Sequence, residues 1–113
     1  MGLTLLYSPC RGDLVWLTFT PQAGHEQAGR RPALVVSPQQ NNKKAGLALL
    51  CPVTSHRKGY PFEVILPDGL PVAGVVLADQ IRSLDWLARQ ADFACTVPES
   101  VVTEVLAKLA QIL

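Results

Sequence analysis

The stretch RRPALVVSPQQNNKKAGLALLCPVT, residues 30–54, contains two short apolar segments separated by a polar one. The apolar segments, 32–37 and 47–53, are rich in leucine and valine and nearly continuous, which predicts two buried strands. Pro32 opens the first of them, a position at which a strand tolerates proline. The polar residues 38–46 predict a loop. This stretch therefore indicates a sheet of short strands joined by polar loops.

The same alternation continues on both sides of this stretch. Further strands are predicted over residues 13–19, 62–66, 72–78 and 91–97, polar loops over 20–31 and 54–61, a tight turn at 67–69, and a short turn or helical piece within 79–86. Short strands joined by tight loops and followed by a helix predict a mainly β fold, a small curled antiparallel barrel with a C-terminal helix.

The last predicted element is this helix, over residues 98–113. The tetrapeptide TVPE at 96–99 matches a capping box with proline near the first helical turn. Apolar residues then recur at close to the helical period of 3.6, so one face of the helix is expected to cover the sheet. That apolar stripe consists of Val102, Val105, Leu106, Leu109, Ile112 and Leu113.

Composition narrows the class of protein. The chain has 113 residues, of which 49% are hydrophobic and 17% charged, so residues 1–113 are expected to form one globular domain. No apolar run reaches the roughly 18 residues of a membrane helix, and no membrane partner is expected. The three cysteines, Cys10, Cys51 and Cys95, are widely spaced and fit a reducing cytoplasm. We expect no metal and no cofactor, because no acidic or Cys/His cluster suits Mg²⁺ or zinc.

Charge is distributed unevenly along the chain. Residues 1–60 contain seven Lys/Arg and two Asp/Glu, whereas residues 61–113 contain three Lys/Arg and seven Asp/Glu. Such asymmetry is typical of a protein with a basic face for a polyanion. Mixed charges that only keep a small domain soluble would give the same counts, so this interpretation stays open on charge alone.

Two of the polar loops are expected to meet. In an antiparallel meander, alternate loops leave the same end of the sheet. The loop over 20–31 would join the first two strands, and the loop over 54–61 would join the third and fourth. One rim of the barrel would then gather Glu26, Arg30, Arg31, Thr54, Ser55, His56, Arg57 and Lys58.

These residue types suit the cleavage of an RNA phosphodiester by its neighbouring 2′-hydroxyl, a reaction that needs no metal. Arginine can neutralise the charge that develops on phosphorus. The hydroxyl of Thr54 can donate a hydrogen bond to the same oxygens. Glu26, His25 and His56 are nearby groups that can move protons. Taken singly, each of these residues also has an ordinary role on a protein surface.

Seven motifs in order carry a stronger signal: GDLVW (12–16), EQAGRRPA (26–33), VSP (36–38), NNK (41–43), CPVT (51–54), KGYPFEV (58–64) and ADQIRSL (78–84). Together they span residues 12–86, and over this span the chain resembles the MazF/PemK family of toxin endoribonucleases. The resemblance implies a small SH3-like barrel of the CcdB/PemK type, with short helices, that forms a homodimer in the bacterial cytoplasm.

The resemblance also implies an activity. Members of this family cleave single-stranded RNA, mainly mRNA, at short sequences and without a metal, which leaves a 2′,3′-cyclic phosphate and a 5′-hydroxyl and inhibits translation and growth. A MazE-like antitoxin is implied as partner, its acidic tail covering the basic rim by charge complementarity. DNA binding is expected only through the antitoxin complex.

The family's functional residues fall on three positions of this chain. Its arginine in a Gly-x-Arg-Pro stretch corresponds to Arg31, its threonine after the third strand to Thr54, and its loop glutamate to Glu26. Candidate RNA-binding residues are His25, Gln27, Arg30, Asn42, Lys43, Ser55, His56, Arg57 and Lys58. Relatives often have histidine where this chain has Arg30, and the residues after Thr54 are richer in base-reading groups. The RNA target of a relative therefore cannot be transferred.

Three other functions stay open at this point. A non-enzymatic, CcdB-like toxin that binds a topoisomerase would not need Arg31 and Thr54 at one rim. A passive nucleic-acid-binding barrel would tolerate the loss of Glu26 and Thr54. An inactive member of the family is disfavoured by its intact motifs. RNA cleavage that leaves 5′-hydroxyl ends would distinguish the nuclease from all three.

Overall fold

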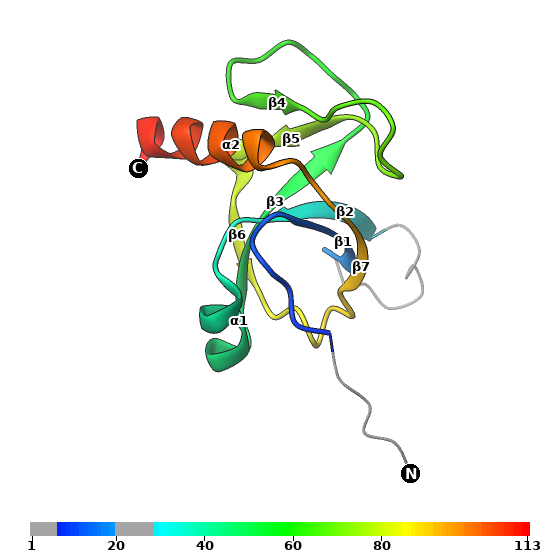
Figure 1. Cartoon of the computed structure of the whole chain (residues 1–113), viewed down its shortest axis with the longest axis vertical. Coiled ribbons are helices and arrows are strands. Elements are labelled where there is room, and N and C mark those ends of the chain that lie inside the picture. The colour runs from blue at the N-terminus through cyan, green and yellow to red at the C-terminus, as the bar shows by residue number, and fades with distance from the viewer. Residues whose placement is uncertain (1–6, 20–28) are drawn as a thin grey trace.

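The computed structural model of the protein describes residues 7–19 and 29–113, so the predicted site residues His25, Glu26 and Gln27 lie outside the described part. The described chain is mainly antiparallel sheet with two α-helices (Figure 1). Its elements are β1 (Asp13–Thr18), β2 (Arg30–Val35), α1 (Gln39–Ala45), β3 (Ala48–Thr54), β4 (Glu63–Ile65), β5 (Val75–Leu77), the 3₁₀ helix η1 (Ala78–Gln80), β6 (Arg82–Leu84), β7 (Asp92–Thr96) and α2 (Glu99–Ile112).

The strands form one sheet in the order β4-β5-β3-β2-β1-β7, and β6 pairs with β3 off this path. β3 is the shared strand: its first residues pair with β6, whereas its last two, Val53 and Thr54, pair with β5. Within the described residues β4 and β7 do not pair with each other. The mainly β fold with a C-terminal helix is confirmed, and the sheet is curled but open rather than a closed barrel.

The simple meander that the loops suggested is wrong in its strand order after β3. β3 pairs with β5 and not with β4, which instead lies at the edge of the sheet beside β5. Gly74, just before β5, allows β5 to lie beside β3. Its φ of +128° is a conformation that glycine adopts readily, and the absence of a side chain lets it lie against the backbone of Thr54. A Cβ added to Gly74 would lie 2.2 Å from the Thr54 carbonyl oxygen.

Residues 38–46, predicted as a loop, contain the helix α1. Helix α1 has no apolar face by which the sequence would predict a helix. A single buried polar side chain, that of Asn42, anchors it instead. Asn42 is fully buried, accepts a hydrogen bond from Ser37 Oγ at 2.6 Å and donates to the Pro9 carbonyl at 2.8 Å. Gly46 ends the helix in the left-handed conformation, φ 70°, and its N–H bonds to the Asn42 carbonyl.

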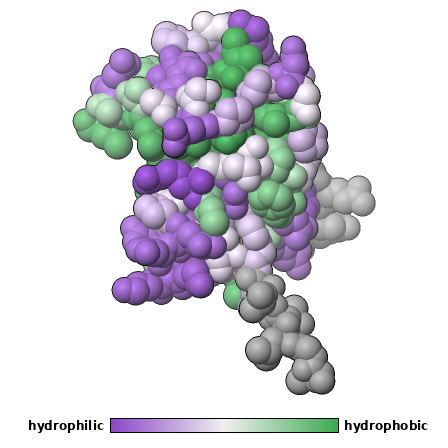
Figure 2. Space-filling view, in the orientation of Figure 1, coloured by the Kyte–Doolittle hydropathy of each residue, from purple (hydrophilic) through white to green (hydrophobic). Residues whose placement is uncertain are grey.

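Helix α2 confirms the predicted C-terminal helix but not its cap. The capping box is wrong: Pro98 is the N-cap and makes no side-chain cap, while Thr96 belongs to β7 and its hydroxyl donates to Asp13 at 3.5 Å. Within the apolar stripe, Val102, Val105 and Leu109 are buried and Leu106 is partly buried. Ile112 and Leu113 remain exposed, and Figure 2 shows hydrophobic surface at this end of the helix.

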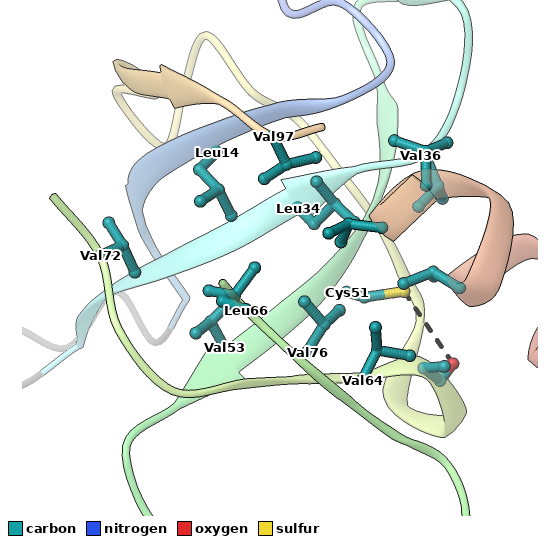
Figure 3. Packing of buried hydrophobic residues seen from close by; sticks show 14 of the residues in the cluster. Leu14, Leu34, Val36, Cys51, Val53, Val64, Leu66, Val72, Val76 and Val97 are labelled. Atoms are coloured by element: carbon teal, nitrogen blue, oxygen red, sulfur yellow. Dashed lines mark hydrogen bonds between the residues drawn. The ribbon is translucent and has the colours of Figure 1, made fainter. Parts of the chain in front are cut away.

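The core consists of two clusters of buried side chains. The larger one lies between the sheet and α2, and Figure 3 shows it around Leu34, Val53 and Cys51, whose thiol donates to the Ala78 carbonyl at 3.9 Å. The second cluster includes Val15, Leu17, Ala33, Val35, Leu50 and Trp86. Neighbouring residues of β1, β2 and β3 thus pack into different clusters, which explains why these strands are nearly continuous apolar runs. None of the described helices is long and apolar enough to cross a membrane.

Candidate functional site

Arg31 and Thr54 come together across neighbouring strands. β2 and β3 pair antiparallel with Ala33 opposite Pro52, so Arg31 at the start of β2 and Thr54 at the end of β3 lie at the same end of this strand pair. Arg31 is exposed at the start of β2, and Thr54 is half-buried at the end of β3. Both residues line the same two surface pockets. The predicted meeting of the two strand ends is therefore present despite the different strand order.

The two pockets form one groove, because Arg31, Thr54 and His56 line both of them. One pocket has a volume of about 350 Å³, and its further lining includes Trp16, Pro32, Val53, Ser55, Pro71, Val72 and Ala73. The other has a volume of about 490 Å³, and its further lining consists of Lys58, Tyr60, Glu63, Leu77 and Gln80. Arg31 and Thr54 thus occupy the middle of the groove, with space for a ligand on each side.

The Thr54 hydroxyl is oriented by its own loop. Its Oγ accepts a hydrogen bond from the His56 backbone N–H at 3.1 Å. A hydroxyl that accepts in this way keeps its own proton for donation to a ligand. The backbone of Thr54 is also held in place, because Gly74 packs directly against its carbonyl group. Thr54 is therefore a pre-positioned hydrogen-bond donor.

The loop after Thr54 is held in shape by two charged side chains. The Glu63 carboxylate accepts hydrogen bonds from the N–H groups of Lys58 at 3.1 Å and Gly59 at 2.9 Å. Lys108, on α2, donates to the Pro61 carbonyl at 2.6 Å. These contacts tie the loop to β4 and to α2, so the groove wall that carries Lys58 is formed before any ligand binds.

Other predicted site residues lie in different places. Ser55 and His56 line the groove, whereas Arg57 lines a third pocket of about 320 Å³, which shares Ser55 and Ala73 with the first. Lys43 is exposed on α1, and neither pocket of the groove is lined by it.

Two predicted RNA-binding residues have structural partners instead. Asn42 is fully buried in the anchor of α1, so its predicted contact with RNA disagrees with the structure. Arg30 donates to the Asp92 carboxylate at 2.6 Å and to the Gln90 carbonyl at 2.7 Å. Successive side chains of a strand point to opposite faces, which separates Arg30 from its neighbour Arg31. Neither residue lines the pockets of the groove.

Sequence reasoning missed several groove residues. Tyr60, Glu63 and Gln80 belong to motifs that were recognised, KGYPFEV and ADQIRSL, yet nothing in either motif shows that they face Arg31. Their position depends on β5 returning beside β3, which the meander did not include. Trp16 is 40% exposed and lines the groove, although tryptophans are more often core residues. An aromatic residue in a predicted strand indicates a surface site only once the structure shows that its ring is exposed beside the neighbouring strands.

The groove can bind a phosphate and donate hydrogen bonds to it. Its described cations are Arg31 and Lys58, His56 lines it as well, and the Glu63 carboxylate is engaged by backbone N–H groups. Across residues 7–19 and 29–113, no three His, Cys, Asp or Glu side chains are grouped so that they could hold a metal ion. Burial raises the pKa of the Cys51 thiol to about 12, so this cysteine is a core residue and not a nucleophile.

Comparisons with known proteins agree with one another. Residues 10–113 match the family model described as PemK-like, MazF-like toxin of type II toxin-antitoxin system. The Escherichia coli K12 endoribonuclease toxin MazF is 48% identical over 103 residues, which cover 91% of this chain and 92% of the relative. Endoribonuclease PemK of E. coli is 39% identical, over 91% of this chain and 80% of its own.

Solved structures give the same result. A crystal structure of MazF from Deinococcus radiodurans superposes with a TM-score of 0.86 at 59% identity, over 94% of this chain and 96% of the other. A crystal structure of MazE-MazF from the same organism gives a TM-score of 0.87 at 57% identity, again over 94% of this chain and 96% of the other.

Proposed function

Because the chain belongs to the PemK-like, MazF-like toxins of type II toxin-antitoxin systems, we propose that it is an endoribonuclease that cleaves single-stranded RNA, chiefly mRNA, at short sequences. The observation that carries this proposal is the groove whose two pockets are both lined by Arg31, at the start of β2, and Thr54, at the end of β3. Cleavage of mRNA would inhibit translation and growth. The single match over residues 10–113 supports one domain.

The reaction we assign to the groove is attack of the 2′-hydroxyl on the adjacent phosphorus. The 2′-oxygen forms a bond to phosphorus, the bond from phosphorus to the 5′-oxygen breaks, and a proton moves from the first oxygen to a base and from an acid to the second. The products are a 2′,3′-cyclic phosphate and a 5′-hydroxyl. No metal takes part, because the guanidinium of Arg31 balances the phosphorane charge. Thr54 donates a hydrogen bond to a phosphate oxygen and so orients the phosphate.

The proton acceptor is assigned to Glu26, with His56 as the alternative. Glu26 lies outside the described residues, so its assignment rests on the family motif alone. His56 lines both pockets beside Thr54. Glu63 also lines the groove, but its carboxylate accepts two backbone N–H groups, so we assign it to holding the loop.

Bases on either side of the cleaved phosphate would occupy the two pockets. Single-stranded RNA is read by stacking and by hydrogen bonds to splayed bases. The residues assigned to binding RNA are His25, Gln27, Lys43, Ser55, His56, Arg57 and Lys58. Since His56 and Arg57 line different pockets, they would contact nucleotides at different positions.

The partners we propose are a MazE-like antitoxin and a second copy of this chain. The similar chain in the crystal structure of MazE-MazF from Deinococcus radiodurans matches this one over most of its length, which supports an antitoxin partner. An acidic antitoxin segment would complement the cations of the groove and compete with RNA. DNA would be bound only through the antitoxin complex, and the bacterial cytoplasm is the compartment in which mRNA is met.

The test is an incubation of the purified protein with a long single-stranded RNA in EDTA, followed by mapping of the RNA ends. Variants Arg31→Ala and Thr54→Ala are run beside it, and Thr54→Ser serves as the control that keeps the hydroxyl. We expect discrete cuts with 5′-hydroxyl ends. Loss of Arg31 is expected to slow cleavage on the order of 10²- to 10³-fold, since it removes a donor that stabilises charge in the transition state.

Two results would contradict the proposal. A folded Arg31→Ala protein that cleaves at the wild-type rate would remove the assigned role of this arginine. If the wild-type protein, free of antitoxin, cleaves none of several RNAs, a non-enzymatic toxin that binds a topoisomerase becomes the better interpretation, and DNA gyrase would be the next partner to test.

A further inference from the structure

Arg30 is bonded to a segment far away in the sequence. Its guanidinium donates to the Asp92 carboxylate at 2.6 Å and to the carbonyls of Gln90 and Arg89 at 2.7 Å and 3.4 Å. It also donates to the Thr18 hydroxyl at 3.4 Å. These acceptors come from β1, from β7 and from the turn before β7. The side chain of Arg30 is 29% exposed, so most of it is covered by these contacts.

Arg89 makes the reciprocal contact from the same turn. Its guanidinium donates to the carbonyls of Thr18 at 3.0 Å and Phe19 at 2.6 Å, and its own carbonyl accepts the Thr18 N–H at 3.0 Å. Phe19 in turn donates its N–H to the Gly29 carbonyl at 2.7 Å. We call Arg30, Arg89 and Asp92 the arginine clasp. It joins the end of β1 and the start of β2 to the turn at 85–91.

The arginine clasp holds Arg30, the residue that directly precedes Arg31. Arg30 and Arg31 are consecutive at the start of β2, and their side chains point to opposite faces of the strand. The backbone of Arg30 cannot shift without moving Arg31 in the groove. Four described acceptors hold Arg30, whereas the described residues provide no hydrogen-bond acceptor for the Arg31 side chain. Among the described residues, only the backbone of β2 therefore fixes the position of Arg31.

We propose that Arg30 is a positioning residue, which through the arginine clasp holds the start of β2 so that Arg31 reaches the cleaved phosphate opposite Thr54. This inference rests on the proposed function. It replaces the prediction from the sequence that Arg30 contacts RNA directly. The carboxylate of Asp92 already neutralises the guanidinium, and an RNA phosphate would have to displace it.

The two roles of Arg30 predict different effects on RNA binding. A cation that contacts a phosphate of single-stranded RNA contributes about 0.7 to the slope of log K against log salt. Its removal would weaken binding and flatten that slope. A positioning residue makes no such contact, so its removal would leave the affinity and the slope unchanged and would slow the chemical step alone.

Asp92 sharpens the distinction, because the two roles of Arg30 predict different effects of removing the Asp92 carboxylate. If Arg30 contacts RNA, removal of the adjacent negative charge would tighten RNA binding. If the clasp positions Arg31, the same removal would slow cleavage. Asp92 is 77% exposed, so the variant Asp92→Ala is expected to fold. Glu104, exposed on α2, provides the matched removal of a carboxylate away from the clasp.

The experiment compares Arg30→Ala, Asp92→Ala and Glu104→Ala with the wild type. Single-turnover cleavage of an RNA oligonucleotide is measured at saturating protein, and affinity for the same oligonucleotide with 2′-deoxyribose at the cleavage point is measured at several KCl concentrations. Thermal melting of each variant sets an assay temperature at which all are folded.

We expect Arg30→Ala to lower the saturated rate by about 10- to 100-fold, as misplacement of a reacting group does, with the dissociation constant and the salt slope unchanged. Asp92→Ala is expected to lower it about two- to fivefold, since one exposed ion pair is lost while the other clasp contacts remain. Glu104→Ala should cleave at the wild-type rate.

Three results would overturn the inference: weaker binding with a flatter salt slope in Arg30→Ala at an unchanged rate, tighter binding without loss of rate in Asp92→Ala, or a lower melting temperature as the only change in both. Failure of the proposed function would show itself differently, because the wild-type protein itself would then not cleave RNA.

Discussion

At the scale of single residues, Gly74 determines how closely β5 approaches Thr54. Its φ of +128° is a conformation that residues with a side chain rarely adopt, and a Cβ there would lie 2.2 Å from the Thr54 carbonyl oxygen. The obstacle is backbone, which cannot turn aside as a flexible side chain can. Gly74 therefore links the packing of the sheet to the position of the groove threonine.

We expect Gly74→Ala to lower the free energy of unfolding by more than about 2 kcal/mol, from backbone strain and overpacking together. Gly69→Ala is the matched control, because Gly69 also has a positive φ, +93°, but a Cβ there meets nothing within 4 Å. We expect Gly69→Ala to lower the free energy of unfolding by about 1 kcal/mol, the cost of the left-handed conformation alone. Urea unfolding of the two variants measures both values, and equal losses would contradict the close contact at Thr54.

The neighbours Arg30 and Arg31 show what sequence can and cannot predict at this scale. Their shared motif identified Arg31 as a groove residue, which agrees with its place in both pockets. The same motif suggested RNA binding by Arg30. The acceptors of Arg30 lie on Arg89, Gln90 and Asp92, about sixty residues away, and no local pattern reveals a contact over that separation.

At the scale of elements, the apolar strands were predictable, whereas α1 and the short strand β6 (Arg82–Leu84), which lies within the segment predicted as a turn or helical piece, were not. Strands buried on both faces are short apolar runs, and such runs are visible in the sequence. Helix α1 carries no apolar stripe, because its anchor is the polar network of Asn42, Ser37 and Pro9. Trp86 adds a hydrogen bond from its Nε1 to the Asn42 carbonyl at 3.0 Å. A tertiary anchor of this kind has no local signature.

Removal of the Asn42 side chain tests whether this residue is structural. Asn42→Ala is expected to cost about 2–3 kcal/mol of stability, because buried partners on Ser37 and Pro9 lose their hydrogen bonds. RNA affinity and the rate per folded molecule should stay at wild-type values. Asn41→Ala, at the exposed neighbour, is the control for both properties. A selective loss of RNA affinity in Asn42→Ala would instead support the contact that the motif suggested.

At the scale of the whole molecule, the groove belongs to no single element. Arg31 comes from β2, Thr54 from β3, and Glu63 from β4, while Gln80 ends η1. The motifs that carry these residues were recognisable separately, so the family and the two central residues were predicted. Their arrangement was not, because it requires β5 to lie between β3 and β4. The strand order is a property of the complete fold.

The shared strand β3 has a consequence for how the molecule opens. Both hydrophobic clusters contain its side chains: Cys51 and Val53 belong to one, Ala48 and Leu50 to the other. Neither half of the sheet can melt while the other persists, so unfolding should be a single cooperative event. Amide protons of β3 are expected to exchange with solvent only through global unfolding, which hydrogen exchange detected by NMR would measure. Faster exchange in β3 than in β1 would indicate that the sheet opens in parts. If β3 opens only globally, the groove threonine at its end keeps its place for as long as the chain stays folded.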